Sequence, residues 1–200
     1  MTTPRKGTSK RNYRYQLRVE LQDISPIIWR LIWVESNLSL VQLHHVVQAA
    51  MGWSDAHLHE FTIDDMHYAT PHPEDDLDRP LSDERRVRLH TLLKPGLEFE
   101  YLYDFGDSWQ HTIRVERAES VKELYGYAHI EAGSRACPPD DCGGPCAYQA
   151  FLDQLKTDPR NEEVTEFLNW AGNDFDPSRF DRHAANATLS RMAWNRWGTK

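Results

Sequence analysis

Two runs of alternating hydrophobic residues on either side of a short polar turn constrain the fold of this chain more than any other feature. Large apolar side chains fall at every second position, at Leu97, Phe99, Tyr101 and Tyr103 before the turn and at Ile113 and Val115 after it. This period of two predicts a β-hairpin with one buried face. The turn, Asp104-Phe-Gly-Asp-Ser-Trp-Gln-His111, contains more carboxylate, aromatic and imidazole groups than closing a hairpin requires. We therefore expect a functional site at this turn.

The remaining elements are strands that come mostly first and helices that come mostly last. Strands are predicted over residues 13–21, 27–34 and 57–63, and helices over residues 40–51, 147–155, 162–170 and 182–194. Residues 119–145 are rich in glycine and proline, and we expect them to be irregular. This order favours an α+β fold, a single domain with a mostly antiparallel sheet and helices packed on one side.

The charge is unevenly distributed along the chain. The net charge of −8 disfavours a protein whose whole surface binds nucleic acid, because phosphate binding needs clustered lysine and arginine. Residues 1–14 are the exception, with Arg5, Lys6, Lys10, Arg11 and Arg14 and no acidic residue. We predict a disordered basic arm over residues 1–12 and one domain over residues 13–200. The arm is either a solubilising tail, the interpretation that we favour, or a contact to nucleic acid.

The cysteines indicate a reduced environment and offer one candidate zinc site. Three cysteines are an odd number, and no segment has the character of a membrane span or secretory signal, so we expect a cytoplasmic protein with no membrane partner. Cys137, Cys142 and Cys146 have spacings close to those of structural zinc sites, although a fourth ligand must come from elsewhere. The alternative, which we favour, is that they are small apolar side chains in a rigid loop.

A second candidate metal site involves histidines near the predicted hairpin. His57 and His59 are two residues apart, so on a strand both side chains point to the same face. Together with Asp107 or His111 they would supply three ligands and an open position for a divalent metal such as zinc. The alternative is a pair of histidines on a solvated sheet face. His44 and His45, within a predicted helix, are expected at the surface or at an interface.

A ligand other than a metal could use the same part of the chain. The candidate ligand-binding residues are Trp53, His57, His59, Tyr103, Asp104, Asp107, Trp109 and His111. Carboxylates bind hard cations or polar ligands, and the aromatic side chains could stack on bases. In the alternative interpretation, Asp104 and Asp107 accept hydrogen bonds from loop amides and Trp109 fills the core.

Four ordered motifs give the chain a family resemblance. They are Tyr15-Gln-Leu-Arg-Val-Glu-Leu21 with Pro26-Ile-Ile-Trp-Arg30, Gly52-Trp-Ser-Asp-Ala-His-Leu-His-Glu-Phe61, Tyr101-Leu-Tyr-Asp-Phe-Gly-Asp-Ser-Trp-Gln-His111, and Cys137-Pro-Pro-Asp-Asp-Cys-Gly-Gly144. In this order they resemble the plasmid pRiA ORF-3-like family, whose members are also labelled transposon TnpR-like passenger proteins. The resemblance implies a single α+β domain and assigns no catalytic residue. A serine resolvase needs an activated serine among arginines, whereas Ser108 lies between Asp107 and Trp109.

These observations lead to two functional hypotheses from different classes. The first is a non-enzymatic binding or accessory module associated with plasmid or mobile-element DNA, with nucleic acid contacted through the basic arm. The alternative is a metal-dependent hydrolase or nuclease in which a cluster of histidine and aspartate holds the cation and a bound water attacks. A protein-interaction subunit, with a protein as its partner, is a third hypothesis.

Overall fold

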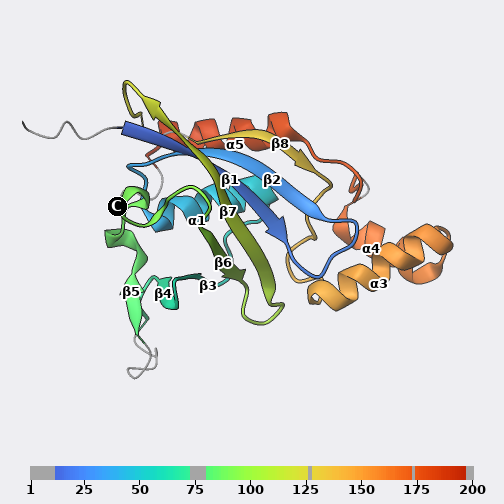
Figure 1. Ribbon diagram of the computed structural model, residues 1–200. Helices are drawn as coiled ribbons and strands as arrows, with labels where there is room; N and C mark the ends of the chain where they lie inside the picture. Colours follow the sequence, from blue (N-terminus) through green and yellow to red (C-terminus); the bar gives the residue numbers. More distant parts are fainter. Residues whose placement is uncertain (1–11, 73–79, 126–127, 173, 197–200) are drawn as a thin grey trace, which may run out of the picture.

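The protein folds around one eight-stranded sheet, and the predicted α+β class is confirmed (Figure 1). The computed structural model describes residues 12–72, 80–125, 128–172 and 174–196. The strands are β1 (Asn12–Leu21), β2 (Ile28–Glu35), β3 (His59–Ile63), β4 (Met66–Ala69), β5 (Leu81–Asp83), β6 (Glu98–Tyr103), β7 (Trp109–Val121) and β8 (Ala128–Ser134). The helices are α1 (Leu40–Met51), α2 (Leu89–Leu92), α3 (Gly144–Thr157), α4 (Glu162–Ala171) and α5 (Arg182–Trp194), with one 3₁₀ turn, η1 (Glu84–Arg86).

The strand order is β5-β4-β3-β6-β7-β1-β2-β8, and neighbouring strands are antiparallel except for β4 and β5. Helices α1 and α5 cover one face of the sheet, while α3 and α4 form a helical pair at one end of the molecule (Figure 1). Phe151 of α3 stacks on Phe167 of α4 with 3.9 Å between ring centroids, which holds that pair together. Within the described residues, no helix combines the length and apolar character that crossing a membrane requires.

The predicted hairpin is present and supplies much of the core. Tyr103 at the end of β6 pairs with Trp109 at the start of β7, and both side chains have 0% exposure. Helix α1 also forms where its sequence predicts. Ser39 and Gln42 make a capping box at its start, and Gly52 ends it with a φ of 93°. Each fully buried leucine of this helix contributes about 1.5–3 kcal/mol of hydrophobic stabilisation.

Two expectations about elements were wrong. Residues 119–145 were expected to be irregular, but β7 extends to Val121 and β8 forms the edge of the sheet beside β2. Helix α5 holds β8 in place, because the Asn186 side chain accepts a hydrogen bond from Ile130 N and donates one to Ile130 O, both 2.9 Å long. Gly133 of β8 has no room for a side chain, since a Cβ there would lie 2.6 Å from Phe180. Strand β3 begins at His59, so His57 lies outside it.

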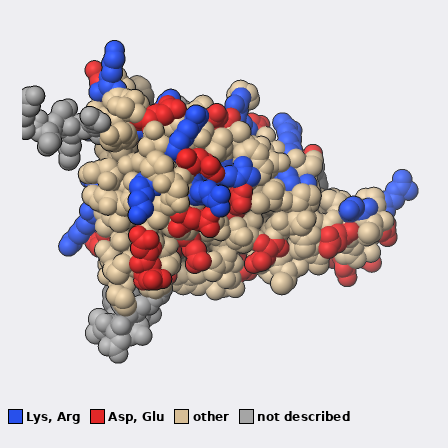
Figure 2. All heavy atoms as spheres, viewed as in Figure 1, with Lys and Arg blue, Asp and Glu red and all other residues tan. Residues whose placement is uncertain are grey.

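The uncovered face of the sheet carries both positively and negatively charged side chains. Arg14 pairs with Glu119 at 2.7 Å, and Arg114 pairs with Glu98 at 2.6 Å. Figure 2 shows basic and acidic side chains interleaved over this face. The predicted basic arm falls almost entirely outside the described residues, since the structure begins at position 12.

Candidate metal centre

Three segments that are distant in the sequence meet near the turn between β6 and β7. They are the segment before β3, the turn itself at residues 104–108, and the loop before α3. Asp104 N donates to Leu58 O at 2.9 Å, and Gly143 N donates to the Asp107 carboxylate at 3.2 Å. These bonds tie the turn to both of the other segments, so one site is built from three sequence motifs.

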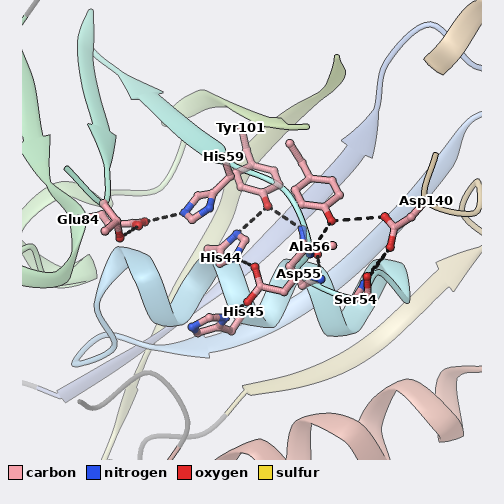
Figure 3. A network of polar contacts seen from close by, with 12 residues as sticks. His44, His45, Ser54, Asp55, Ala56, His59, Glu84, Tyr101 and Asp140 are labelled. Carbon is pink, nitrogen blue, oxygen red and sulfur yellow. Dashed lines mark hydrogen bonds and ion pairs between the residues drawn. The ribbon is translucent and has the colours of Figure 1, made fainter. Parts of the chain in front are cut away.

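Asp140 fastens the loop before α3 to the segment before β3. Its carboxylate accepts hydrogen bonds from Ser54 N at 3.2 Å, Ser54 Oγ at 2.7 Å and Tyr103 Oη at 3.4 Å (Figure 3). Burial and the nearby Asp140 charge raise the pKa of Tyr103 well above its usual range, so its hydroxyl keeps the proton that it donates. The Tyr103 hydroxyl also accepts from Ala56 N at 3.3 Å. Asp140 therefore fixes the position of the next residue, Asp141.

His57, Asp104 and Asp141 point at one another with the spacing of metal ligands. His57 Nε2 lies 3.6 Å from Asp104 Oδ2 and 3.3 Å from Asp141 Oδ1, and the three ligand atoms lie within 4.8 Å of one another. His57 Nε2 is buried and has no hydrogen-bond partner among the described residues. A tetrahedral zinc ion with bonds of roughly 2.0–2.1 Å sets its ligand atoms about 3.3 Å apart. Both observed separations fit the edges of such a coordination shell, and the 3.6 Å separation from Asp104 is too long for a hydrogen bond.

The Asp104 carboxylate is oriented by its own turn. Its Oδ1 accepts hydrogen bonds from Gly106 N at 2.9 Å and Asp107 N at 3.3 Å, which leaves Oδ2 directed at His57. Asp104, Asp141 and Asp55 all have φ values near +60°, a conformation that costs a residue with a side chain roughly 1–2 kcal/mol. Backbone strain of this kind gathers at functional sites, where the surrounding structure enforces it.

The other candidate residues of the histidine–aspartate metal site lie elsewhere. His59 Nε2 pairs with the fully buried Glu84 at 2.9 Å. His111 is completely buried, and its Nδ1 donates to the carbonyls of Trp109 at 2.9 Å and Tyr101 at 3.2 Å. The structure therefore does not bring His57, His59, Asp107 and His111 into one ligand set. The physical reason is that β3 begins only at His59. His57 and His59 therefore do not lie on one strand, and the expected common face for their side chains is lost.

The aromatic candidates surround the metal centre from the core side. Trp53 is 8% exposed, stacks on Tyr103 with ring centroids 4.8 Å apart, and donates from Nε1 to Pro138 O at 2.9 Å. Trp109 has no exposed surface. These rings support the three segments by packing and have little surface to offer to a nucleic-acid base.

The three cysteines do not converge. All are free thiols: Cys137 is buried against Met51, with 3.0 Å between the sulfurs, Cys142 is half-buried and Cys146 is exposed. Burial raises the pKa of Cys137 to about 11, which disfavours the thiolate that zinc requires. Among the described residues, neither group with the spacing of a metal site includes a cysteine.

Sequence reasoning missed a second polar cluster beside the metal centre. His44, expected at the surface or at an interface, is 1% exposed, and it bonds through Nδ1 to Tyr101 Oη at 2.8 Å and through Nε2 to Asp55 at 2.6 Å (Figure 3). His45 contacts the other Asp55 oxygen at 3.1 Å. These are hydrogen-bond distances, so we interpret the cluster as a buried polar network. The position of His44, one residue after Leu43 and three before Val47 in the apolar stripe of α1, is the sequence signal that would have found it.

The pKa shifts in this network follow from burial and hydrogen bonding. Burial lowers the pKa of His44 to about 4, so the imidazole is neutral at pH 7. Burial opposes ionisation of Asp55, but hydrogen bonds from His44 and His45 outweigh it and hold the pKa of that carboxyl well below its usual range. His59 stacks on His44 with 3.4 Å between ring centroids, which links Glu84 to the network.

Comparisons with known proteins give family relationships and the fold. The family model described as "Plasmid pRiA4b ORF-3-like protein" matches residues 13–184, which include the whole candidate site. "Uncharacterized protein y4hQ" from Sinorhizobium fredii (strain NBRC 101917 / NGR234) is 38% identical over 188 residues, covering 92% of this chain and 94% of that protein. The crystal structure of the protein of unknown function MM3350 from Methanosarcina mazei Go1 matches with a TM-score of 0.77 and 35% identity, covering 87% of this chain and 98% of that one.

Proposed function

The chain belongs to the plasmid pRiA4b ORF-3-like family, and from that premise we propose that it is a non-enzymatic module that binds a divalent transition-metal ion through His57, Asp104 and Asp141. One observation carries the proposal. The buried Nε2 of His57 has no hydrogen-bond partner among the described residues, and it faces carboxylate oxygens at 3.3 and 3.6 Å. An ion between them would satisfy the imidazole and neutralise both carboxylates.

The donor set indicates which ions the centre prefers. One imidazole nitrogen and two carboxylate oxygens suit Zn²⁺ or Mn²⁺, whereas Cu⁺ favours thiolates and Mg²⁺ favours six oxygen ligands. The Asp141 side chain is 73% exposed, while Asp104 is 11% exposed. The ion would therefore enter from the Asp141 side and keep an open coordination position toward solvent.

The neighbouring carboxylates favour binding over hydrolysis. A hydrolase would need a base near the metal-bound water. The Asp140 carboxylate is occupied by Ser54 and Tyr103, and Asp107 accepts from Gly143 N. With both engaged in holding the loops together, we prefer a binding module to the metal-dependent hydrolase or nuclease.

We attribute the expected contact with plasmid or mobile-element DNA to the basic arm and not to the metal centre. Arginines on the uncovered sheet face are paired with glutamates, which leaves little net positive charge for phosphates. The three free thiols are consistent with a reduced, cytoplasmic environment. The TnpR-like label then describes association with mobile elements and not a recombinase reaction.

Metal titration of the full-length protein tests the centre. We expect Zn²⁺ to bind with one ion per chain in calorimetry, and Co²⁺ to give a visible absorption spectrum that reports its coordination. His57→Ala removes the only nitrogen ligand and should weaken binding more than about 100-fold, because even residues that merely support ligands contribute 10–100-fold.

A matched substitution provides the control for this experiment. His129→Ala removes an exposed imidazole from β8 and should leave the affinity unchanged. Circular dichroism checks that both variants keep the fold. Stoichiometric zinc binding by a folded His57→Ala variant would exclude this centre, and binding that disappears only when Cys142 and Cys146 are replaced would assign the ion to the thiols.

A further inference from the structure

A groove that none of the proposed metal ligands lines lies between the β1–β2 turn and α3. It has a volume of about 970 Å³, within the range of small-molecule sites. Its walls are the turn at residues 23–26, one side of α3, the segment at residues 176–178, and Arg135. None of the metal-centre residues lines it, so its ligand would be independent of the proposed cation.

Arg135 is the unusual residue of this groove. It is half-buried, and its Nε is buried with no hydrogen-bond partner among the described residues. None of the ion pairs within the described residues includes it. Its φ of 68° is also unfavourable for a residue with a side chain. Asp176 interacts with the Arg135 charge electrostatically without forming an ion pair, so the buried Nε donor still lacks an acceptor that an anion can supply.

Two of the three acidic side chains that line the groove, Asp176 and Asp153, accept hydrogen bonds from neighbouring residues. Asp176 accepts hydrogen bonds from Ser178 N at 2.9 Å and Ser178 Oγ at 2.6 Å. Asp153 accepts from Gln149 Nε2 at 3.0 Å. These carboxylates are therefore held in place next to the groove, and neither of them forms an ion pair with Arg135.

The groove is pre-formed and has an apolar floor. Gln149 accepts a hydrogen bond from Ser25 N at 2.7 Å and donates one to Ser25 O at 3.1 Å, which locks the β1–β2 turn onto α3. Ile24 and Leu152 contribute apolar surface, each 7% exposed. Because the walls are fixed before binding, a ligand would lose little free energy in ordering them.

We propose that this groove binds a small molecule or chain end that carries a carboxylate on an apolar body, with Arg135 as the anchor. A carboxylate matches the planar fork of the guanidinium with two parallel hydrogen bonds. The groove lining has Arg135 and Lys156 against Asp23, Asp153 and Asp176, so a doubly charged phosphate would be repelled more than a singly charged carboxylate. The apolar body would cover Ile24 and Leu152.

NMR titration of the full-length protein tests the proposal with a matched pair of probes. N-acetyl-leucine carries the carboxylate, and N-acetyl-leucine amide has the same body without the charge. We expect the acid to shift the Arg135 Nε–H resonance and the amides of α3 at millimolar concentrations, and the amide probe to shift neither. Acetate should bind more weakly than N-acetyl-leucine, because it lacks the apolar body.

Two substitutions separate Arg135 from a general effect of charge. Arg135→Gln should weaken N-acetyl-leucine binding at least about tenfold, since one charge-assisted bidentate contact is lost. Arg160→Gln removes an exposed arginine from the turn between α3 and α4 and should have no effect. If Arg135→Gln does not fold, Arg135→Lys keeps the charge but not the fork and should still weaken binding.

Three results would contradict the proposal that the groove binds a carboxylate. No shift with N-acetyl-leucine or acetate overturns the proposal, as does equal binding of the acid and its amide. Binding of inorganic phosphate in preference to both carboxylates assigns the groove to a phosphorylated ligand and overturns the carboxylate assignment.

Discussion

Burial sets the protonation state of two histidines that are not among the proposed metal ligands. Burial lowers the pKa of His111 to about 4, and it does the same for His44. In the unfolded chain both return to the ordinary value of 6.5. Between these values the unfolded state binds more protons than the folded state, so the free energy of unfolding must fall as the pH falls.

We expect the protein to lose stability between about pH 6.5 and pH 4, with each buried histidine contributing roughly 3 kcal/mol over that interval. Urea unfolding at a series of pH values measures this dependence. His111→Gln removes one titrating group and keeps a side-chain donor for the carbonyls of Trp109 and Tyr101. The variant should therefore show a clearly shallower decline with falling pH.

His129→Gln is the matched control for that measurement. His129 is exposed on β8, and its replacement should leave the pH dependence as it is in the parent protein. A His111→Gln variant with the parent's full decline would show that other groups cause it. A free energy of unfolding that is constant from pH 7 to pH 4.5 would contradict the buried neutral state of both histidines.

At the scale of elements, the proposed metal centre depends on how closely the loop before α3 approaches the turn between β6 and β7. Gly144 allows that approach, because a Cβ at this position would lie 2.6 Å from the backbone oxygen of Asp107. Its φ is 78°, a conformation that favours glycine. A side chain here would push the loop that carries Asp141 away from the turn that carries Asp104.

Gly144→Ala should therefore reduce both stability and metal affinity. Gly96→Ala is the matched control, since Gly96 has a φ of 85° and open space around its Cβ position. Both substitutions impose the same left-handed backbone penalty of roughly 1–2 kcal/mol. Only Gly144→Ala should also weaken Zn²⁺ binding, measured by calorimetry. Equal zinc affinities in the two variants would mean that the close approach does not position Asp141.

Local sequence patterns predicted the elements better than they predicted the contacts between them. The alternation around the hairpin and the cap at Ser39 each report on a single element, and both are seen in the structure. Strand β8 was missed because glycine in sequence indicates a turn. In the structure Gly133 lies within the strand, where close packing against Phe180 leaves no room for a side chain. His44 was missed because its partners, Asp55 and Tyr101, come from another loop and another strand.

The candidate site shows the same difference between elements, which local patterns predict, and contacts, which they do not. The motifs pointed to loops that the structure brings together, because each contains more polar groups than its turn needs. Which ligands converge depends on long-range geometry that no local pattern contains. His57 faces Asp104 and Asp141 because Asp140 is held by Ser54 and Tyr103. These three residues come from three separate motifs.

At the scale of the whole molecule, the charge distribution decides whether the folded domain alone can bind DNA. The net charge is −8, and the arginines of the uncovered sheet face are paired with carboxylates or lie over tryptophan rings. Arg18, for example, lies 4.4 Å from the centroid of the Trp29 ring and also pairs with Glu20. Such a surface repels a phosphate backbone as strongly as it attracts one.

We therefore expect any affinity of the full-length protein for duplex DNA to come from Arg5, Lys6, Lys10 and Arg11. Four phosphate contacts would make the affinity fall roughly 100-fold between 50 and 200 mM salt. Replacing these four residues with glutamine should abolish binding in a fluorescence anisotropy titration at low salt. Arg18→Gln, on the sheet face, should leave it unchanged. If the arm variant retains the affinity and Arg18→Gln loses it, the sheet face is the nucleic-acid surface, and the ion pairs that cover it must open when DNA binds.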